Sequence, residues 1–430
     1  MDYFKLSANN STVKIELLAG LTTFLATMYI IVVNPSILQA AGMPFSAVLT
    51  ATVLVSTFSS IAMGVYANNP IVLAPGMGIN AFFVYTVVLG MGVPWSTALG
   101  AVFWSGIIFI LLSVFNVRTA VVQAIPKQLR YAVASGIGLF IATIGLTNAK
   151  FIVANPATII GLGEMNAVTL TFLAGLAITA VLAVRRVRGA LIIGIAVTTL
   201  LAVPVGRLWG ETSLVSWKGV WSAPDFSLLF KLDVWGSLQL ALWPVIFSFL
   251  FTDMFDSLST FIGVAEAANL TDPDGEPRNI KASLIVDGIS TTLSGLLGTS
   301  SGTSYIESAA GIEEGGRTGL TAVVAGLLFL PFMFFSPLLS VVPTIATAPA
   351  LVLVGVFMMK PVQKINWGKL DDAVPALLAL LLIPLTNSIT QGIIWGFLSW
   401  TIIKALTGKR NEISPMMLII DLLAIAALVV

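Results

Sequence analysis

Long runs of apolar residues, separated by short polar stretches, repeat along the whole chain. Most runs are roughly 17 to 25 residues long, the length that an α-helix needs to cross a hydrocarbon core of about 30 Å. We interpret them as helices because lipid offers the backbone no hydrogen-bond partner, and the short alternating segments of a β-barrel are not seen. The pattern predicts fourteen crossings, near residues 15–36, 46–66, 70–92, 95–115, 131–147, 167–184, 188–205, 237–265, 282–298, 301–313, 317–338, 341–358, 372–387 and 389–406.

The composition agrees with an all-α polytopic membrane protein. Of the 430 residues, 57% are hydrophobic and 10% are charged, whereas a soluble domain carries about 25% charged residues. A last apolar stretch, 413–430, contains Asp421 and is expected either to lie in the interface or to fold back. The polar N-terminus lacks the features of a cleavable signal peptide.

Several function classes are excluded by what the sequence lacks. A net charge of +1 argues against a nucleic-acid partner. The chain has no cysteine and no histidine, so disulfides, thiolate metal sites and HExxH zinc sites are ruled out. It also has no P-loop and no visible nucleophile–base pair. We therefore expect no cofactor, no metal and no enzyme activity, and any proton transfer has to rest on carboxylates, lysines, tyrosines or water.

The basic residues give the orientation. With the N-terminus inside, the predicted outer segments hold only Lys150, Arg207, Lys218 and Lys231, which leaves 17 of the 21 Lys and Arg residues on the inner side. Cytoplasmic loops carry such an excess of Lys and Arg. We predict a multi-pass protein of the cell (inner) membrane with a cytoplasmic N-terminus.

The third and tenth segments do not read as continuous helices. The third opens with NNPIVLAPGMG (68–78), and the tenth is rich in Gly, Ser and Thr (298–316). Interrupted segments at matching places in two halves point to a transporter's substrate site. "QAAG" at 39–42 and "EAAN" at 266–269 are offset by 227, and so are Asn80 and Glu307. This favours an inverted repeat of seven plus seven segments, joined by the outer loop 206–236.

Charges at bilayer depth are costly, and they are therefore candidates for function. Asp253, Asp256 and Thr260 follow i, i+3, i+7 spacing on one helix face of the eighth segment. Two carboxylates so close cannot both ionise cheaply in a low dielectric, which suits reversible protonation. The structural alternative is a carboxylate bonded to hydroxyl or backbone groups of a neighbouring helix.

Other polar and aromatic residues could contact a flat heterocycle. The Glu307 carboxylate can accept from ring N–H or amino groups, and the Asn80 amide offers both donors and an acceptor. Their structural alternatives are a helix cap and a packing asparagine. Ser304 is a further candidate contact, and Asp287 is either a relay or a partner for hydroxyl groups. Candidate stacking rings are Phe82, Phe83, Phe251, Phe255 and Tyr305.

Several motifs together resemble the AzgA-type purine permeases, the adenine/guanine/hypoxanthine branch of the nucleobase–ascorbate transporter family. They are NNPIVLAPGMGINAFF (68–83), FTDMFDSLST (251–260), GTSSGTSYIESAAGIEEGGRTGLTAV (298–323), PALVLVGVFMM (349–359) and IPLTNSITQGIIWGF (383–397). The similarity spans nearly the whole chain, and the motif in the tenth segment is its most specific part.

The resemblance implies a fold of fourteen segments in two inverted repeats, with short strands in segments three and ten. It implies a core domain, residues 1–115 and 237–338, and a gate domain, residues 116–236 and 339–430. By resemblance, Asp256, Glu307 and Asn80 match the family's acidic and asparagine positions at the substrate. Family members are proton symporters and often dimers, so a homodimer is possible here.

We therefore predict a transporter that imports adenine, guanine or hypoxanthine by proton symport with alternating access. The expected substrate contacts are Asn80, Phe251, Asp256, Thr260, Ser304 and Glu307, and the expected proton-coupling residues are Asp253, Asp256 and Glu307. Uracil- and xanthine-type branches keep different residues, including a histidine in some members, and this chain has none. The alternatives are a transporter of another nucleobase, an anion exchanger of related fold, a channel or an intramembrane enzyme.

Overall fold

The computed structural model describes residues 3–115, 125–155, 158–208, 215, 217–268, 270–271 and 277–429. Within these ranges nine helices are long and apolar enough to cross a membrane, and three shorter apolar helices accompany them. Three features used in the sequence analysis lie at least partly outside the described residues. They are Arg118, one of the basic residues of the predicted inner side, Asn269 of the EAAN motif, and part of the loop 206–236.

All fourteen predicted segments are found in the described part of the chain, and the fold class is confirmed. The first seven are α1–α2 (Val13–Thr27, Ile30–Gln39), α3–η2 (Phe45–Ala62, Met63–Ala67), β1–α4–η3 (Leu73–Pro75, Met77–Ala81, Phe82–Gly90), α5 (Trp95–Val114), α7 (Lys127–Asn148), α8 (Ala167–Val184) and α9 (Ala190–Leu208). The second seven are α10 (Trp243–Ala268), α11 (Ile280–Leu297), β4–η6–α12 (Gly302–Ser304, Ile306–Ser308, Ala309–Glu313), α13–η7 (Gly319–Phe329, Leu330–Phe334), α15 (Thr344–Met358), α16 (Leu370–Leu385) and α17 (Ile389–Leu406).

The structure adds three details to the sequence pattern. The first segment breaks between α1 and α2, at Met28 and Tyr29. A hairpin of β2 (Ile152–Asn155) and β3 (Ile159–Leu162) follows α7, where only a loop was expected. The apolar stretch at the C-terminus forms α18 (Pro415–Val429), which packs on α17 and α10. Of the two placements expected for this stretch, it therefore folds back onto the bundle.

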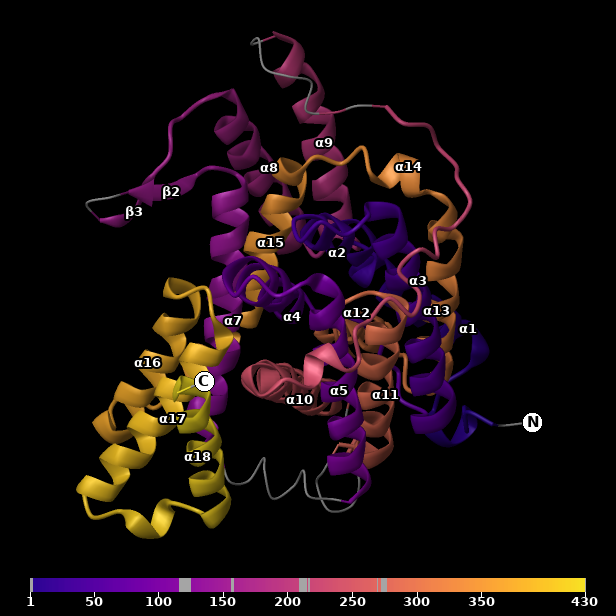
Figure 1. Cartoon of the computed structure of the whole chain (residues 1–430). Coiled ribbons are helices and arrows are strands. Elements are labelled where there is room, and N and C mark those ends of the chain that lie inside the picture. The colour runs from indigo at the N-terminus through magenta and orange to yellow at the C-terminus, as the bar shows by residue number, and fades with distance from the viewer. Residues whose placement is uncertain are drawn as a thin grey trace.

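The helices pack in two groups. α5 packs along α11, and α13 packs on both α1 and α3. In the other group α7 packs on α15 and α16, α16 on α17, and α8 on α9. Figure 1 shows α16, α17 and α18 on one side of the molecule and α1, α3 and α13 on the other, with α10 and α4 between them.

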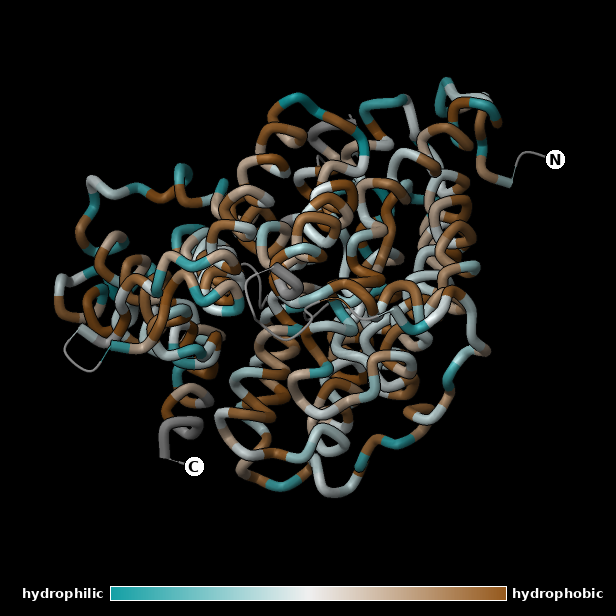
Figure 2. Tube along the Cα trace, turned by 90° about the horizontal axis from the view of Figure 1, so that it is seen from above, coloured by the Kyte–Doolittle hydropathy of each residue, from teal (hydrophilic) through white to brown (hydrophobic). Residues whose placement is uncertain are grey.

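Apolar side chains also cover the outside of the bundle. In Figure 2 hydrophobic colour runs along the helices, whereas hydrophilic colour gathers in the connections. Leu200, Leu406 and Leu422 expose 70%, 82% and 67% of their surface. Such a wide apolar surface would be unfavourable in water and is what a helix bundle in lipid presents.

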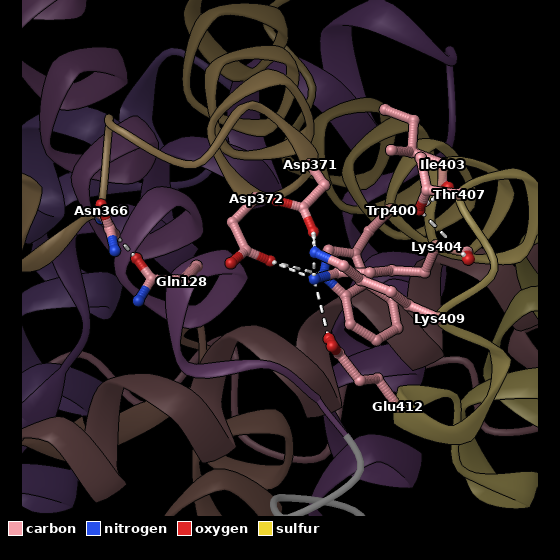
Figure 3. A network of polar contacts seen from close by, with 10 residues as sticks. All are labelled: Gln128, Asn366, Asp371, Asp372, Trp400, Ile403, Lys404, Thr407, Lys409 and Glu412. Atoms are coloured by element: carbon pink, nitrogen blue, oxygen red, sulfur yellow. Dashed lines mark hydrogen bonds and ion pairs between the residues drawn. The ribbon is translucent and has the colours of Figure 1, made fainter.

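A charged cluster around the buried Lys404 joins α16, α17 and η9 (Arg410–Glu412) (Figure 3). Lys404 is 3% exposed, and its Nζ lies 2.8 Å from Asp371, 3.1 Å from Asp372 and 2.8 Å from Glu412. The Trp400 indole N–H donates to Asp372 at 3.1 Å. A buried ammonium needs such partners because desolvation of an unpaired charge costs several kcal/mol.

Replacing Lys404 by Met should lower the thermal unfolding midpoint of the purified protein. The variant leaves three carboxylates facing one another without their shared cation, which costs roughly 3 kcal/mol for a buried pair. Lys409→Met is the matched control, since Lys409 also binds Asp371 but is 45% exposed; its loss should cost less than about 1 kcal/mol. Equal effects of the two variants in a melting assay would contradict a special role for Lys404.

Candidate functional site

The two interrupted segments, far apart in sequence, are joined by the antiparallel strands β1 and β4. Beyond the strands, Tyr305 N donates to the Val72 carbonyl at 2.9 Å, and Val72 N donates to the Ser308 hydroxyl at 3.0 Å. An unpaired strand at bilayer depth would leave backbone groups without partners, at a cost of several kcal/mol each. Each broken segment therefore supplies the hydrogen-bond partners that the other requires.

Side chains of the neighbouring helices hold β4 in place. The Thr291 hydroxyl of α11 lies 3.1 Å from the Gly302 carbonyl and shares its one proton between this oxygen and Asp253. Thr260 of α10 donates to the Ser304 carbonyl at 3.2 Å. A Cβ atom at Gly302 would lie 2.2 Å from the Ser290 hydroxyl of α11. Only glycine allows the strand to approach α11 this closely.

The strand pairing joins the two halves at the place that the internal repeat predicts. Pro75 lies opposite Gly302, and Ala74 lies opposite Thr303. These pairs correspond to offsets of 227 (302 − 75) and 229 (303 − 74), so a two-fold axis through the strand pair is compatible with the predicted offset of 227.

A cavity of about 330 Å³ opens beside the strand pair, within the range of about 300–1,000 Å³ usual for small-molecule sites. One wall comes from the first, third, eighth and tenth segments, and the other from α7, α15 and η8 (Lys360–Lys364). The first wall contributes Tyr29, Gly76, Met77, Gly78, Asp256, Thr260, Gly263, Thr303, Ser304, Tyr305, Ile306 and Glu307, and the second Ala134, Val354, Phe357, Met358, Lys360, Pro361 and Lys364.

Two of the predicted acids face this cavity. Asp256 of α10 is half-buried and forms no hydrogen bond to another described residue. Glu307, in the 3-10 turn before α12, is also half-buried and accepts a hydrogen bond from the Tyr29 hydroxyl at 2.8 Å. The first wall adds no lysine or arginine to the lining. Both carboxylates are therefore available to donors of a bound molecule.

Thr260 and Ser304 line the same cavity, as predicted, but both hydroxyls are already engaged. The Thr260 hydroxyl binds the Ser304 backbone, and the Ser304 hydroxyl donates to Asp287 at 3.0 Å. Asp287 also accepts from the Ser257 hydroxyl at 2.5 Å, and Ser257 meets the Thr303 hydroxyl at 2.8 Å. Asp287 thus supports the cavity wall from behind, as a partner for hydroxyl groups.

Asp253 lies behind the wall and not in it. Its side chain is 1% exposed and accepts a hydrogen bond from Thr291 of α11. This is the structural arrangement considered as the alternative to a functional role. Asp253 and Asp256 share a helix, but only Asp256 reaches the cavity.

Asn80 and Phe251 also lie outside the cavity lining. Asn80 is fully buried in α4 and accepts from the Ser300 hydroxyl, so it ties α4 to the loop before β4. Phe251 lines a separate apolar cavity of about 430 Å³ between α5, α10, α17 and α18. Its ring packs 5.6 Å from that of Phe255. Of the aromatic candidates, Tyr305 alone lines the cavity beside β4.

The sequence arguments missed Tyr29 and the whole second wall. Tyr29 lies within an apolar run, between Met28 and Ile30. Only its position at the helix break, which the structure shows, indicates that it belongs to the site. Ala134, Val354 and Met358 carry no chemical signal at all. No group of three or more acidic, histidine or cysteine residues that could hold a metal occurs in the described ranges.

The fold and the cavity define a class of protein, a multi-pass membrane transport protein with seven-plus-seven segments. The transmembrane domain of a cyanobacterium bicarbonate transporter, BicA, superposes with a TM-score of 0.67 over 89% of this chain and 97% of that chain. The two sequences are 16% identical, and this likeness concerns the fold alone.

Sequence relatives give the family. The profile described as "Permease family" matches residues 14–394. The adenine permease AdeP of Escherichia coli (strain K12) is 45% identical over 99% of this chain and 95% of its own length. The guanine/hypoxanthine permease PbuO of Bacillus subtilis (strain 168) is 43% identical over 98% of each chain. The chain belongs to this permease family, and its resemblance to the purine permeases is confirmed.

The cavity predicts a pattern of thiol reactivity in this naturally cysteine-free chain. Ala134→Cys should react with a small water-soluble thiol reagent because Ala134 lines the cavity. Ala132→Cys, two residues away on α7, should stay unreactive because Ala132 is fully buried. Labelling followed by mass spectrometry measures both rates. Equal labelling of the two variants would show that the cavity does not reach Ala134.

Proposed function

We propose that the protein imports purine nucleobases, namely adenine, guanine or hypoxanthine, by proton symport with alternating access. The observation that carries the proposal is the cavity in which Asp256 and Glu307 face open space between two groups of helices. The names of the relatives AdeP and PbuO support the substrate class. An uncharged purine offers the N–H and amino donors that two carboxylates accept.

We assign hydrogen bonds with the substrate to Asp256 and Glu307, and places in the wall beside the substrate to Thr260 and Ser304. The two carboxylates supply acceptors, while Thr260 and Ser304 shape the wall with their backbone and side-chain bonds. The Tyr305 ring adds an aromatic surface, since its hydroxyl is held by the Pro75 carbonyl at 2.5 Å. Asn80 and Asp253 act from behind this wall, and Phe251 contributes to the other cavity.

Proton coupling rests on the carboxylates, because the chain has no histidine. Asp256 is the primary proton carrier in this proposal, with Glu307 and the more deeply buried Asp253 as its neighbours. Closing the cavity around a neutral base would desolvate these acids, and a bound proton lowers that cost. The proton gradient then drives uptake of the base.

The two walls correspond to two proposed domains. The core comprises residues 1–115 and 237–338, and the gate comprises residues 116–236 and 339–430. Contacts of α5 with α11 and of α1 with α13 lie within the core, and contacts of α7 with α15 and α16 lie within the gate. Every lining residue of the cavity from Tyr29 to Gly78 and from Asp256 to Glu307 belongs to the core.

Two contacts join the proposed core and gate at the opposite end of this interface. The Thr86 hydroxyl of the core donates to the Asn387 carbonyl of the gate, and the hydroxyls of Ser248 and Thr390 lie 2.6 Å apart. Asn387 and Thr390 lie where α16 passes into α17, at the membrane side away from η8. With the proposed cytoplasmic N-terminus, we assign this arrangement to the inward-facing state of the proposed cycle.

An anion exchanger of related fold would require a basic residue beside the substrate. Lys360 and Lys364 line the cavity, but they come from η8 at its end. The core wall that carries Asp256 and Glu307 adds two acids to the lining and no basic residue. An anion in this position would meet two carboxylates, so the geometry favours a donor-rich neutral base.

Transport in proteoliposomes tests the proposal. Radiolabelled adenine or hypoxanthine should accumulate when the outside is acidic, and a protonophore should abolish the accumulation. Asp256→Asn and Glu307→Gln should each reduce uptake at least about tenfold, because each removes a charged acceptor. Glu313→Gln, an exposed position six residues beyond Glu307, is the control with normal uptake. Purine accumulation in the presence of the protonophore would contradict proton coupling. Normal uptake by both site variants would contradict the assignment of Asp256 and Glu307 to the substrate site.

A reversible cross-link tests alternating access. Ser248→Cys combined with Thr390→Cys should form a disulfide under oxidation, because the two hydroxyls are in contact and no native cysteine competes. Oxidation should stop uptake by holding the outer end shut, and a reductant should restore it. Each single cysteine variant should be insensitive. Unchanged uptake by the cross-linked protein would contradict an opening between α10 and α17.

A further inference from the structure

We propose that Tyr29 is a positioning residue for Glu307. The hydrogen bond from Tyr29 fixes the Glu307 carboxylate and leaves its remaining acceptor positions for the substrate. The Tyr29 hydroxyl donates to Glu307 Oε1 at 2.8 Å, and both side chains line the cavity. The inference rests on the proposed function and deepens it, because it names how the acidic acceptor is oriented. It makes Tyr29 a determinant of which purine edge is recognised.

The break in the first segment brings Tyr29 to the site. α1 ends at Thr27 and α2 begins at Ile30, so Met28 and Tyr29 form the turn between them. The Tyr29 side chain is 1% exposed. A phenol buried at bilayer depth needs a hydrogen-bond partner, and Glu307, 278 positions away in sequence, is the one it has.

Tyr305 lies close to Tyr29 but has a different role. The two rings are 6.5 Å apart between centroids. Tyr305 donates its hydroxyl to the Pro75 carbonyl and its amide to the Val72 carbonyl, so it belongs to the strand scaffold. Tyr29 instead donates to the side chain of Glu307. The pair therefore offers a natural comparison between a scaffold tyrosine and a positioning tyrosine.

The bond has two consequences for recognition. A carboxylate held by a phenol loses less rotamer freedom when the substrate binds, which favours binding. The phenol also occupies one oxygen, so a purine N–H has to approach the remaining acceptor positions from a fixed direction. A site that presents a fixed acceptor rejects an analogue without the matching donor far more strongly than a site that can rearrange.

Binding of a series of purines to the purified full-length protein tests the proposal. The series comprises adenine, hypoxanthine and their ring N-methyl analogues, each of which lacks one N–H donor. Tyr29→Phe should weaken binding of the preferred base about tenfold, as expected for a lost charge-assisted hydrogen bond. The N-methyl analogue that the natural protein rejects most should change little, so the discrimination between the two should shrink. Tyr305→Phe should leave this discrimination unchanged.

Combination with Glu307→Gln separates positioning from general support of the fold. In the Glu307→Gln background, Tyr29→Phe should cause almost no further loss of affinity, since both variants disrupt the same Tyr29–Glu307 interaction. Tyr305→Phe should cause the same loss of affinity in this background as in the natural protein. Tyr29→His, which keeps a ring N–H donor, should recover part of the discrimination. A uniform loss for all purines, or full additivity with Glu307→Gln, would overturn the role of Tyr29.

The outcomes also separate this inference from the proposed function. If the natural protein binds no purine in the series, the proposed function fails. If it binds purines and Tyr29→Phe keeps both the affinity and the discrimination, only the role of Tyr29 fails. Thermal unfolding of the ligand-free variants shows that each is folded, and if Tyr29→Phe is unstable, Tyr29→His and the comparison with Glu307→Gln decide the question.

Discussion

The structure depends on one constraint, which is that no backbone group at bilayer depth goes without a hydrogen-bond partner. Two segments give up helical geometry at Pro75 and Gly302, and the strands β1 and β4 satisfy each other. This pairing is a direct backbone link between the halves of the chain, which also pack through helices such as α5 on α11 and α7 on α15. It also directs the side chains that follow β4, including Glu307, into the cavity. The position of the site therefore follows from the pairing that gives these backbone groups their hydrogen-bond partners.

The carboxylates show how burial sorts similar residues into different roles. Asp253 and Asp287 are nearly fully buried and are bonded to Thr291, Ser257 and Ser304. Asp256 and Glu307 face open space. Because a buried carboxylate needs hydrogen-bond donors, hydroxyl groups of α10, α11 and β4 support the first pair, and the second pair keeps its acceptors for a ligand.

The cavity lies between elements that make most of their contacts within their own group. A relative movement of the groups needs to break only a few bonds at their junction, such as that between Ser248 and Thr390. Tyr29 links the first segment to the tenth within the core wall of the cavity beside β4. Substrate recognition and the relative movement of the two groups of helices would then occur at the same interface, as expected of an alternating-access carrier.

The sequence by itself determined the fourteen segments, the two interruptions and the acids at Asp256 and Glu307, because hydrophobic length, Gly–Pro punctuation and charge at bilayer depth are local properties. Tertiary structure alone decided which side chains share the cavity. Asn80 lies outside the lining because it is fully buried in α4 and is bonded to Ser300. Phe251 and Asp253 point to other neighbours, because helix rotation is set by packing. The apolar second wall and the Tyr29–Glu307 bond join positions far apart in the chain, and only folding brings them together.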